Sequence, residues 1–231
     1  MRIGVVMPTY NQAAYLKDAV DSVMAQTVPI QGPVIVEDGS TDSTPEVLSA
    51  MRVRYVRNGE NIGAARSINA GVVVLRGLNV DAISWVSSDN RMYPNWLEKL
   101  SEALRPGVGA VYSAFNTETP EGKKITIRQG PYSKDRLASS ENCYFGPSFL
   151  IRSEIWRAAG DHEGGSAHDY GHWARVEEAC WAAGLTIEYV DEPLCFYRQH
   201  PEQTVKRRPG LYDAPEQRRK ALERRAKAVL A

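Results

Sequence analysis

The sequence is poor in several features that define whole classes of proteins. Only three of its 231 residues are cysteines, Cys143, Cys180 and Cys195, and they are widely spaced in apolar surroundings. This pattern is more typical of buried free thiols in a reducing compartment than of a disulfide framework. The formal net charge is zero, so the chain as a whole has no electrostatic bias toward nucleic acid. We therefore predict no nucleic-acid partner.

Long apolar runs are also missing. No segment approaches the roughly 20 consecutive apolar residues that a membrane-spanning helix requires. The short apolar segment after Arg2 lacks the long apolar region and cleavage site of a signal peptide. From these absences we expect a cytoplasmic protein with at most peripheral membrane contact. Its length suits one α/β domain with a terminal appendage.

Strand and helix patterns alternate through the first half of the chain. Strand patterns fall at 2–7, 33–37, 53–56, 82–87 and 109–115, and helical patterns at 15–25, 45–51, 64–75 and 96–104. For the second of these helices, Ser43 and Glu46 match a capping box, while Pro45 in the first turn fits a cap at Thr44 equally well. This alternation implies right-handed crossovers, and we predict a Rossmann-like, mostly parallel central sheet flanked by helices.

The pattern changes after residue 115. An exposed strand pattern at 124–128 precedes an irregular stretch at 132–142, a helix at 170–183, and strand patterns at 186–190 and 193–197. We therefore predict one domain over residues 1–205, with halves at 1–115 and 116–205, and a basic helical tail over 206–231.

Small polar residues follow the first two strand patterns abruptly. The segments are Pro8-Thr9-Tyr10-Asn11 and Glu37-Asp38-Gly39-Ser40. In open α/β sheets, ligands bind outside the carboxyl ends of the strands. We therefore expect Thr9, Asn11 and Asp38 to face one crevice, where a carboxylate could read a nucleotide base.

Two further segments extend this series, Asn61-Ile62-Gly63-Ala64-Ala65-Arg66 and Ser87-Ser88-Asp89-Asn90. In this order the four segments resemble the inverting nucleotide-sugar glycosyltransferases of family 2, and the resemblance runs from Arg2 to about His200. It implies the GT-A fold, with a nucleotide-sugar half at 1–115 and an acceptor and catalytic-base half at 116–205. It also implies transfer of a sugar from a nucleotide sugar to an acceptor hydroxyl.

The resemblance implies a donor site built from the strand-end segments. Its residues are Pro8, Thr9, Tyr10, Asn11, Asp38, Asn61, Gly63, Arg66, Ser88 and Asp89. Asp38 would accept a hydrogen bond from the base, commonly the N3–H of uracil, so a UDP-sugar is the preferred donor and dTDP and GDP donors stay open. Asp38 could instead cap its own loop together with Asp42, since such residues favour turns. Arg66 would lie near the base or diphosphate, or be an ordinary solvated helix residue.

A metal site is implied by the same resemblance. Asp89 aligns with the family's metal-binding acid, although Ser87 and Ser88 stand where acids are common. Oxygen ligands suit Mg²⁺ or Mn²⁺. The segment Tyr197-Arg198-Gln199-His200 resembles a late Tyr-Arg-x-His element, which makes His200 a second ligand that would favour Mn²⁺. The alternatives are a structural cap for Asp89 and an exposed loop histidine for His200.

Asp169 is the candidate catalytic base. It maps onto the Asp of the family's Glu-Asp pair, and His168 replaces the Glu. A carboxylate there could take the proton of the acceptor hydroxyl, or it could serve as a helix N-cap. The departures at Ser87, Ser88 and His168 motivate an alternative function, a catalytically impaired nucleotide-sugar-binding or scaffold domain.

The tail over 206–231 is rich in lysine and arginine and carries one apolar stripe. The stripe consists of Leu222, Ala226, Val229 and Leu230. It could pack on its own domain or on the mate of a homodimer, or contact anionic lipid or an acidic protein. The acceptor has no signature in the sequence, and a saccharide, a lipid carrier and a protein all stay open.

Overall fold

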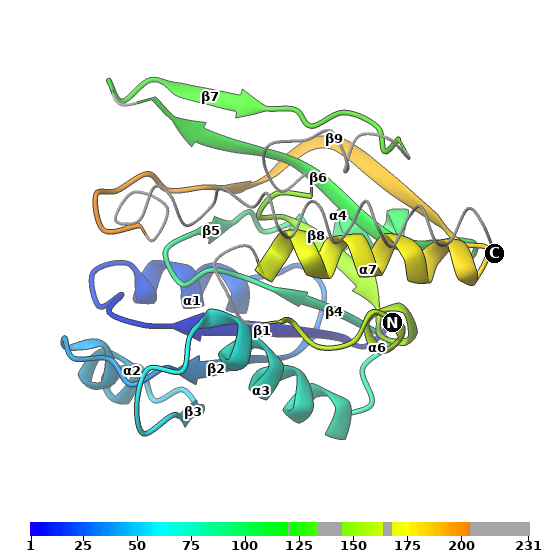
Figure 1. Ribbon diagram of the computed structural model, residues 1–231. Helices are drawn as coiled ribbons and strands as arrows, with labels where there is room; N and C mark the ends of the chain where they lie inside the picture. The colour runs from blue at the N-terminus through cyan, green and yellow to red at the C-terminus, as the bar shows by residue number, and fades with distance from the viewer. Residues whose placement is uncertain (120, 134–144, 164–167, 204–231) are drawn as a thin grey trace.

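The computed structural model describes residues 1–119, 121–133, 145–163 and 168–203 (Figure 1). The strands are β1 (Ile3–Thr9), β2 (Ile30–Glu37), β3 (Tyr55–Arg57), β4 (Ala82–Trp85), β5 (Arg91–Met92), β6 (Val108–Glu118), β7 (Lys124–Ile127), β8 (Phe149–Arg152) and β9 (Thr186–Phe196). The helices are α1 (Leu16–Met24), α2 (Thr44–Met51), α3 (Ala64–Gly77), α4 (Trp96–Ala103), α6 (Ser153–Ala159) and α7 (His168–Ala182). Most of the predicted elements of the first half are therefore confirmed within one or two residues at each end.

All nine strands join one sheet, in the order β3-β2-β1-β4-β8-β6-β9-β5, and β7 pairs with β6. The pairs β1–β2, β1–β4 and β2–β3 are parallel, which confirms the predicted Rossmann-like arrangement for the first half. The second half mixes directions, because β8 runs antiparallel to both β4 and β6 while β9 runs parallel to β6. The strands β1, β2, β4, β6 and β9 consequently end at the same edge of the sheet.

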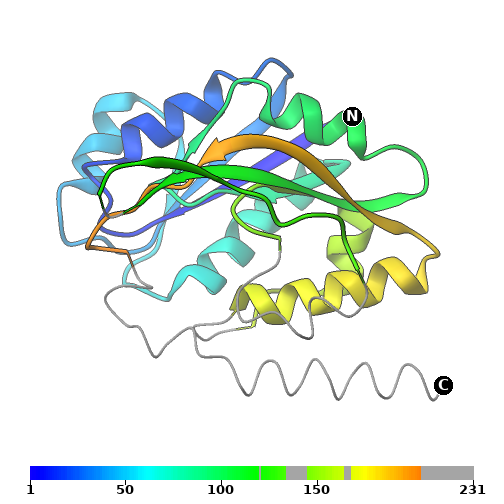
Figure 2. The same ribbon diagram turned by 90° about the horizontal axis from the view of Figure 1, so that it is seen from above.

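Helices cover both faces of the sheet, as Figure 2 shows. On one face, α1, α2 and α4 pack in a core that includes Val5 and Met7 of β1. On the other face, α3, α6 and α7 pack in a core that includes Val6 of the same strand. Successive side chains of a strand point to opposite faces, so a fully buried strand such as β1 serves both cores.

Two local predictions are wrong. The strand patterns at 186–190 and 193–197 form a single strand, β9, whose pairing with β6 shifts between Ser113 and Ala114. The capping box is also not formed, because the side chain of Ser43 makes no cap hydrogen bond. Instead, the backbone N–H of Thr44 donates to the Asp42 carboxylate at 2.9 Å. Asp42 thus satisfies the first N–H of the helix, and a carboxylate is a strong acceptor for it.

Two of the cysteines can be placed. Cys180 and Cys195 are buried free thiols, as predicted, and burial raises the pKa of Cys180 to about 12. Cys143, the stretch at 134–142 and the tail over 206–231 lie outside the described residues. Among the helices of the described part, none is long and apolar enough to cross a membrane.

The cap of α2 gives a prediction about stability and pH. Burial raises the pKa of Asp42, but the hydrogen bonds from Thr44 and Ala13 outweigh it and leave the pKa below its ordinary value of 3.8. The stabilisation is therefore present at neutral pH and is lost as pH falls through this lowered pKa. We expect Asp42→Ala to lower the free energy of unfolding by about 1 kcal/mol at pH 7 in urea titrations, and by less at pH 3.

The matched control is Ser43→Ala, which removes the side chain that the sequence pattern favoured as the cap. We expect it to change the free energy of unfolding by less than about 0.5 kcal/mol. A larger loss for Ser43→Ala than for Asp42→Ala would contradict this account of the cap.

Candidate functional site

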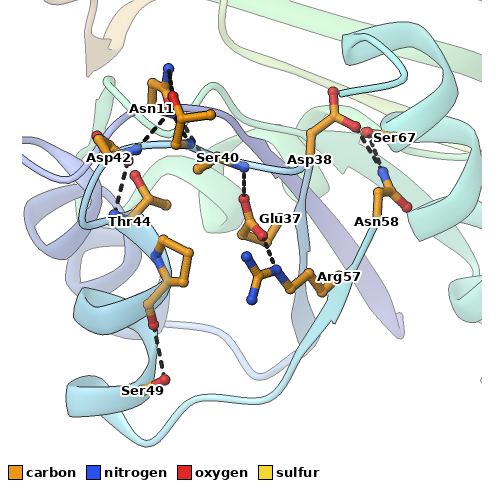
Figure 3. A network of polar contacts seen from close by, with 12 residues as sticks. Asn11, Glu37, Asp38, Ser40, Asp42, Thr44, Ser49, Arg57, Asn58 and Ser67 are labelled. Carbon is orange, nitrogen blue, oxygen red and sulfur yellow. Dashed lines mark hydrogen bonds and ion pairs between the residues drawn. The ribbon is translucent and has the colours of Figure 1, made fainter. Parts of the chain in front are cut away.

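The loops after β1 and β2 are interlocked by hydrogen bonds (Figure 3). Asn11 has a positive φ of 53°, and its side-chain oxygen accepts the backbone N–H of Thr41 at 2.8 Å. Its own backbone N–H donates to the hydroxyl of Ser40 at 3.0 Å. The N–H of Ala13 donates to the Asp42 carboxylate at 3.2 Å. These contacts join two loops that are 30 residues apart in sequence into one unit.

Asp38 binds a third loop, the 58–63 segment that leads into α3. Its carboxylate is 2% exposed and accepts the Asn58 amide at 2.8 Å and the backbone N–H groups of Ile62 and Gly63 at 3.0 and 2.9 Å. The alternative, in which Asp38 and Asp42 together cap their own loop, does not form: Asp38 binds the 58–63 segment and Asp42 binds the start of α2. A carboxylate has about four lone-pair positions, so one is left for a base N–H. The base-reading role of Asp38 stays a prediction.

Gly39 is required where these loops approach each other. A Cβ at this position would lie 2.5 Å from the backbone carbonyl carbon of Glu60 and 2.8 Å from the nitrogen of Asn61. Its φ of 69° also falls in the left-handed region that favours glycine.

Glu37 is a residue that the sequence analysis missed. Its side chain is fully buried, accepts the backbone N–H of Ser40, and pairs with the Arg57 guanidinium at 2.9 Å (Figure 3). Glu37 thus holds the loop that contains Ser40, while Asp38 holds the 58–63 segment. The only sequence signal was a carboxylate directly after the apolar run of β2.

The other predicted donor residues differ in exposure. Thr9 is 2% exposed, and its hydroxyl makes no hydrogen bond within the described part of the chain. Its backbone oxygen accepts the N–H of Asp38 at 2.9 Å, which places the two residues side by side. Pro8 is half-buried and Ser88 is buried. The three exposed members of the set are Tyr10, Asn61 and Arg66.

Asp89 and His200 meet although they are 111 residues apart. The Asp89 Oδ2 lies 3.1 Å from the His200 Nε2, and His200 is 4% exposed. The alternative of an exposed loop histidine is therefore wrong. The two residues meet because β4 and β9 end at the same edge of the sheet.

The Asp89–His200 pair fits a divalent cation in one respect and lacks ligands in another. Two adjacent ligands of an octahedral ion at about 2.1 Å lie about 3.0 Å apart. The observed 3.1 Å separation is that of a direct hydrogen bond, which a cation would have to replace, and it also matches the spacing of such ligands. The Asp89 Oδ1 is buried without a hydrogen-bond partner among the described residues. No group of three or more potential ligand side chains occurs in the part of the chain described. An ion here would need further ligands from water or phosphate.

Tyr197 lies three residues before His200, and Asp169 is the candidate base. Burial, followed by the charges of Asp89 and Asp169, raises the pKa of the Tyr197 phenol to about 12. Asp169 is half-buried in the first turn of α7, where the positive end of the helix dipole stabilises its negative charge. The side chain of His168 lies outside the described part.

Solved glycosyltransferases share this fold. S. aureus TarS in complex with UDP-GlcNAc matches with a TM-score of 0.69 and 16% identity, over 88% of this chain and 60% of that one. The mannosyltransferase PcManGT from Pyrobaculum calidifontis, in complex with GDP-Man and Mn²⁺, matches with a TM-score of 0.66 and 19% identity, over 100% of this chain and 64% of that one. The fold is therefore the GT-A fold.

The chain belongs to glycosyl transferase family 2, whose sequence model matches residues 4–159. An uncharacterized glycosyltransferase of Rickettsia typhi is 27% identical over 217 residues, which cover 88% of this chain and 65% of that protein. The glycosyltransferase GlyG of Streptococcus pneumoniae is 33% identical over 108 residues, which cover 45% of this chain and 35% of that protein. The chain thus spans less than two thirds of the length of these relatives.

The contacts of Asp38 give a second stability prediction. Asp38→Ala leaves the Asn58 amide and two backbone N–H groups without their acceptor, so we expect the free energy of unfolding to fall by about 2–3 kcal/mol in urea. The control is Asp191→Ala, which removes an exposed ion pair with Arg128 and should cost less than about 1 kcal/mol. Equal effects of the two variants would show that the Asp38 contacts do not hold the loop.

Proposed function

We propose that this chain is the catalytic domain of a metal-dependent, inverting glycosyltransferase that moves a sugar from a nucleotide sugar, most readily a UDP-sugar, to an acceptor hydroxyl. The observation that carries the proposal is the meeting of Asp89 and His200 at the carboxyl edge of the sheet. Family membership supports the reaction class.

The interlocked loops after β1 and β2 would bind the nucleotide. The remaining lone pair of Asp38 would accept a base N–H, and beside Asp38 lies Thr9, whose hydroxyl has no hydrogen-bond partner among the residues that the structure describes. The complexes of TarS with UDP-GlcNAc and of PcManGT with GDP-Man show that proteins of this fold bind nucleotide sugars. They also keep a GDP-sugar open as the donor of this chain.

Asp89 and His200 would hold Mn²⁺ or Mg²⁺, with the imidazole favouring Mn²⁺. The bound ion would supply positive charge that stabilises the departing diphosphate. The buried Oδ1 of Asp89 supports this assignment, since a buried carboxylate oxygen without a partner is costly.

Asp169 would act as the base. Its carboxylate takes the proton of the acceptor hydroxyl while that oxygen bonds to the anomeric carbon, and the bond from this carbon to the diphosphate oxygen breaks on the opposite side. The product therefore has inverted configuration. The raised pKa of Tyr197 keeps its phenol protonated at neutral pH, so it does not compete as a base.

Other parts of the assignment stay predictions. They are the cytoplasmic location, the boundary at residue 205, the basic tail over 206–231 as a peripheral membrane or dimer contact, and the identity of the acceptor as a saccharide, lipid carrier or protein.

Nucleotide binding tests the donor and metal site together. We expect calorimetric titration of UDP to show binding with Mn²⁺ or Mg²⁺ and none in EDTA, and Asp89→Ala to weaken it at least about tenfold. The matched control is Asp81→Ala, at the opposite end of β4, where the carboxylate contacts only Arg2 among the residues described. Binding of UDP that ignores both EDTA and Asp89→Ala would exclude the metal-dependent site.

Catalysis tests the base. We expect Asp169→Asn to lower kcat for sugar transfer or donor hydrolysis about 10²–10⁴-fold, because proton removal is lost. The dissociation constant for UDP should stay within about threefold, since the carboxylate is assigned to the acceptor side. If the wild-type protein binds nucleotides but turns over no UDP-, GDP- or dTDP-sugar, the scaffold alternative stands.

A further inference from the structure

Arg198 contacts the loop that carries Asp89 and also reaches helix α1. Its Nε donates to the backbone oxygen of Asp89 at 2.9 Å, and its Nη2 donates to the Asp18 carboxylate of α1 at 2.7 Å. The guanidinium also lies over the ring of Tyr15, 5.1 Å from the centroid. The side chain of Arg198 is 26% exposed and that of Asp18 is 48% exposed. One guanidinium therefore joins the loop after β4 to helix α1.

His200 is fixed by the same neighbours. Its ring lies 4.4 Å from the ring of Tyr15, centroid to centroid. Its backbone N–H donates to the Gln203 side chain at 3.3 Å, and that side chain donates to the backbone oxygen of Arg198. Asn90 accepts the N–H of Arg198 at 3.2 Å. The segment that carries His200 is thus tied to the loop that carries Asp89 at several points.

These contacts need an arginine. A guanidinium is planar, with donors that point in fixed directions, so it reaches a carbonyl and a carboxylate at once and still stacks on a ring. A lysine ammonium is a single point charge and keeps only one of these contacts in good geometry.

We propose that Arg198 is a positioning residue, which together with Asp18 of α1 and Tyr15 just before this helix holds Asp89 and His200 at the separation that a cation requires. The proposal rests on the function proposed above. The two ligand residues come from loops far apart in sequence, and no third protein ligand near them fixes their distance within the part described. Partners that orient metal ligands typically contribute 10–100-fold to affinity.

The test measures binding of Mn²⁺ and Mg²⁺ to the Arg198→Lys and Asp18→Asn variants in the presence of UDP. Electron paramagnetic resonance of free Mn²⁺ and calorimetry report the affinities. We expect Arg198→Lys to bind Mn²⁺ about tenfold more weakly and Asp18→Asn to be weakened in the same direction. The ratio of Mn²⁺ to Mg²⁺ affinity should fall toward the ratio measured for the His200→Asn variant, which has no imidazole. The reason is that a misplaced imidazole no longer favours Mn²⁺ over Mg²⁺. A purely structural role would not change this ratio.

The matched control is Arg152→Lys. Arg152 also donates its Nε to a backbone oxygen, that of Val108 at 2.6 Å, but it pairs with Ala82 at the opposite edge of the sheet. We expect Arg152→Lys to keep the wild-type affinities and ratio. Circular dichroism melts verify that each variant is folded at the temperature used. If Arg198→Lys does not fold, the Asp18→Asn variant, whose side chain is half-exposed, tests the positioning role by itself.

The outcomes separate the two proposals. Wild-type binding with unchanged affinities and metal ratio in both variants overturns the positioning role alone. A wild-type protein that binds no Mn²⁺ with UDP, GDP or dTDP overturns the proposed function. Weaker binding and a lost Mn²⁺ preference in both variants, with Arg152→Lys unchanged, support the positioning role.

Discussion

The loops of the candidate donor site depend on the contacts of the Asp38 carboxylate. It stands where β2 ends, and it binds two backbone N–H groups and one amide of the 58–63 segment. Buried donors of this kind need an acceptor, so this one side chain determines how the chain enters α3. Glu37 does the same for the Ser40 loop on the other side. Two successive acidic residues thus hold two neighbouring loops of the candidate donor site in place.

The direction of β9 is the second constraint. Because β9 runs parallel to β6, its last residue reaches the edge of the sheet where β4 also ends. His200 then meets Asp89, and Arg198 reaches α1. The site has few protein ligands for a cation, since Ser87 and Ser88 stand where the family often has acids. Its geometry therefore depends on the residues that hold Asp89 and His200 in place.

Local patterns in the sequence predicted the first half well. Apolar runs that end in small polar residues located β1 and β2, and helical periodicity located α1 and α3. The same reasoning failed at Ser43, since a match to a capping pattern does not show that the cap hydrogen bond forms. It also missed Glu37 and Arg198, whose roles depend on partners such as Arg57 and Asp18 that no local pattern can identify.

The sequence by itself determined the fold class and the positions of the polar residues at strand ends, because strand periodicity and abrupt polar breaks are local properties. The order of its motifs carried the resemblance to the family. Only the tertiary structure decided that Asp38 grips the 58–63 loop and that Asp89 meets His200 across 111 residues. Only it, too, decided that Arg198 ties this pair to α1. Such contacts depend on the order and direction of strands in the sheet, which are fixed when the two cores pack and not by any single segment.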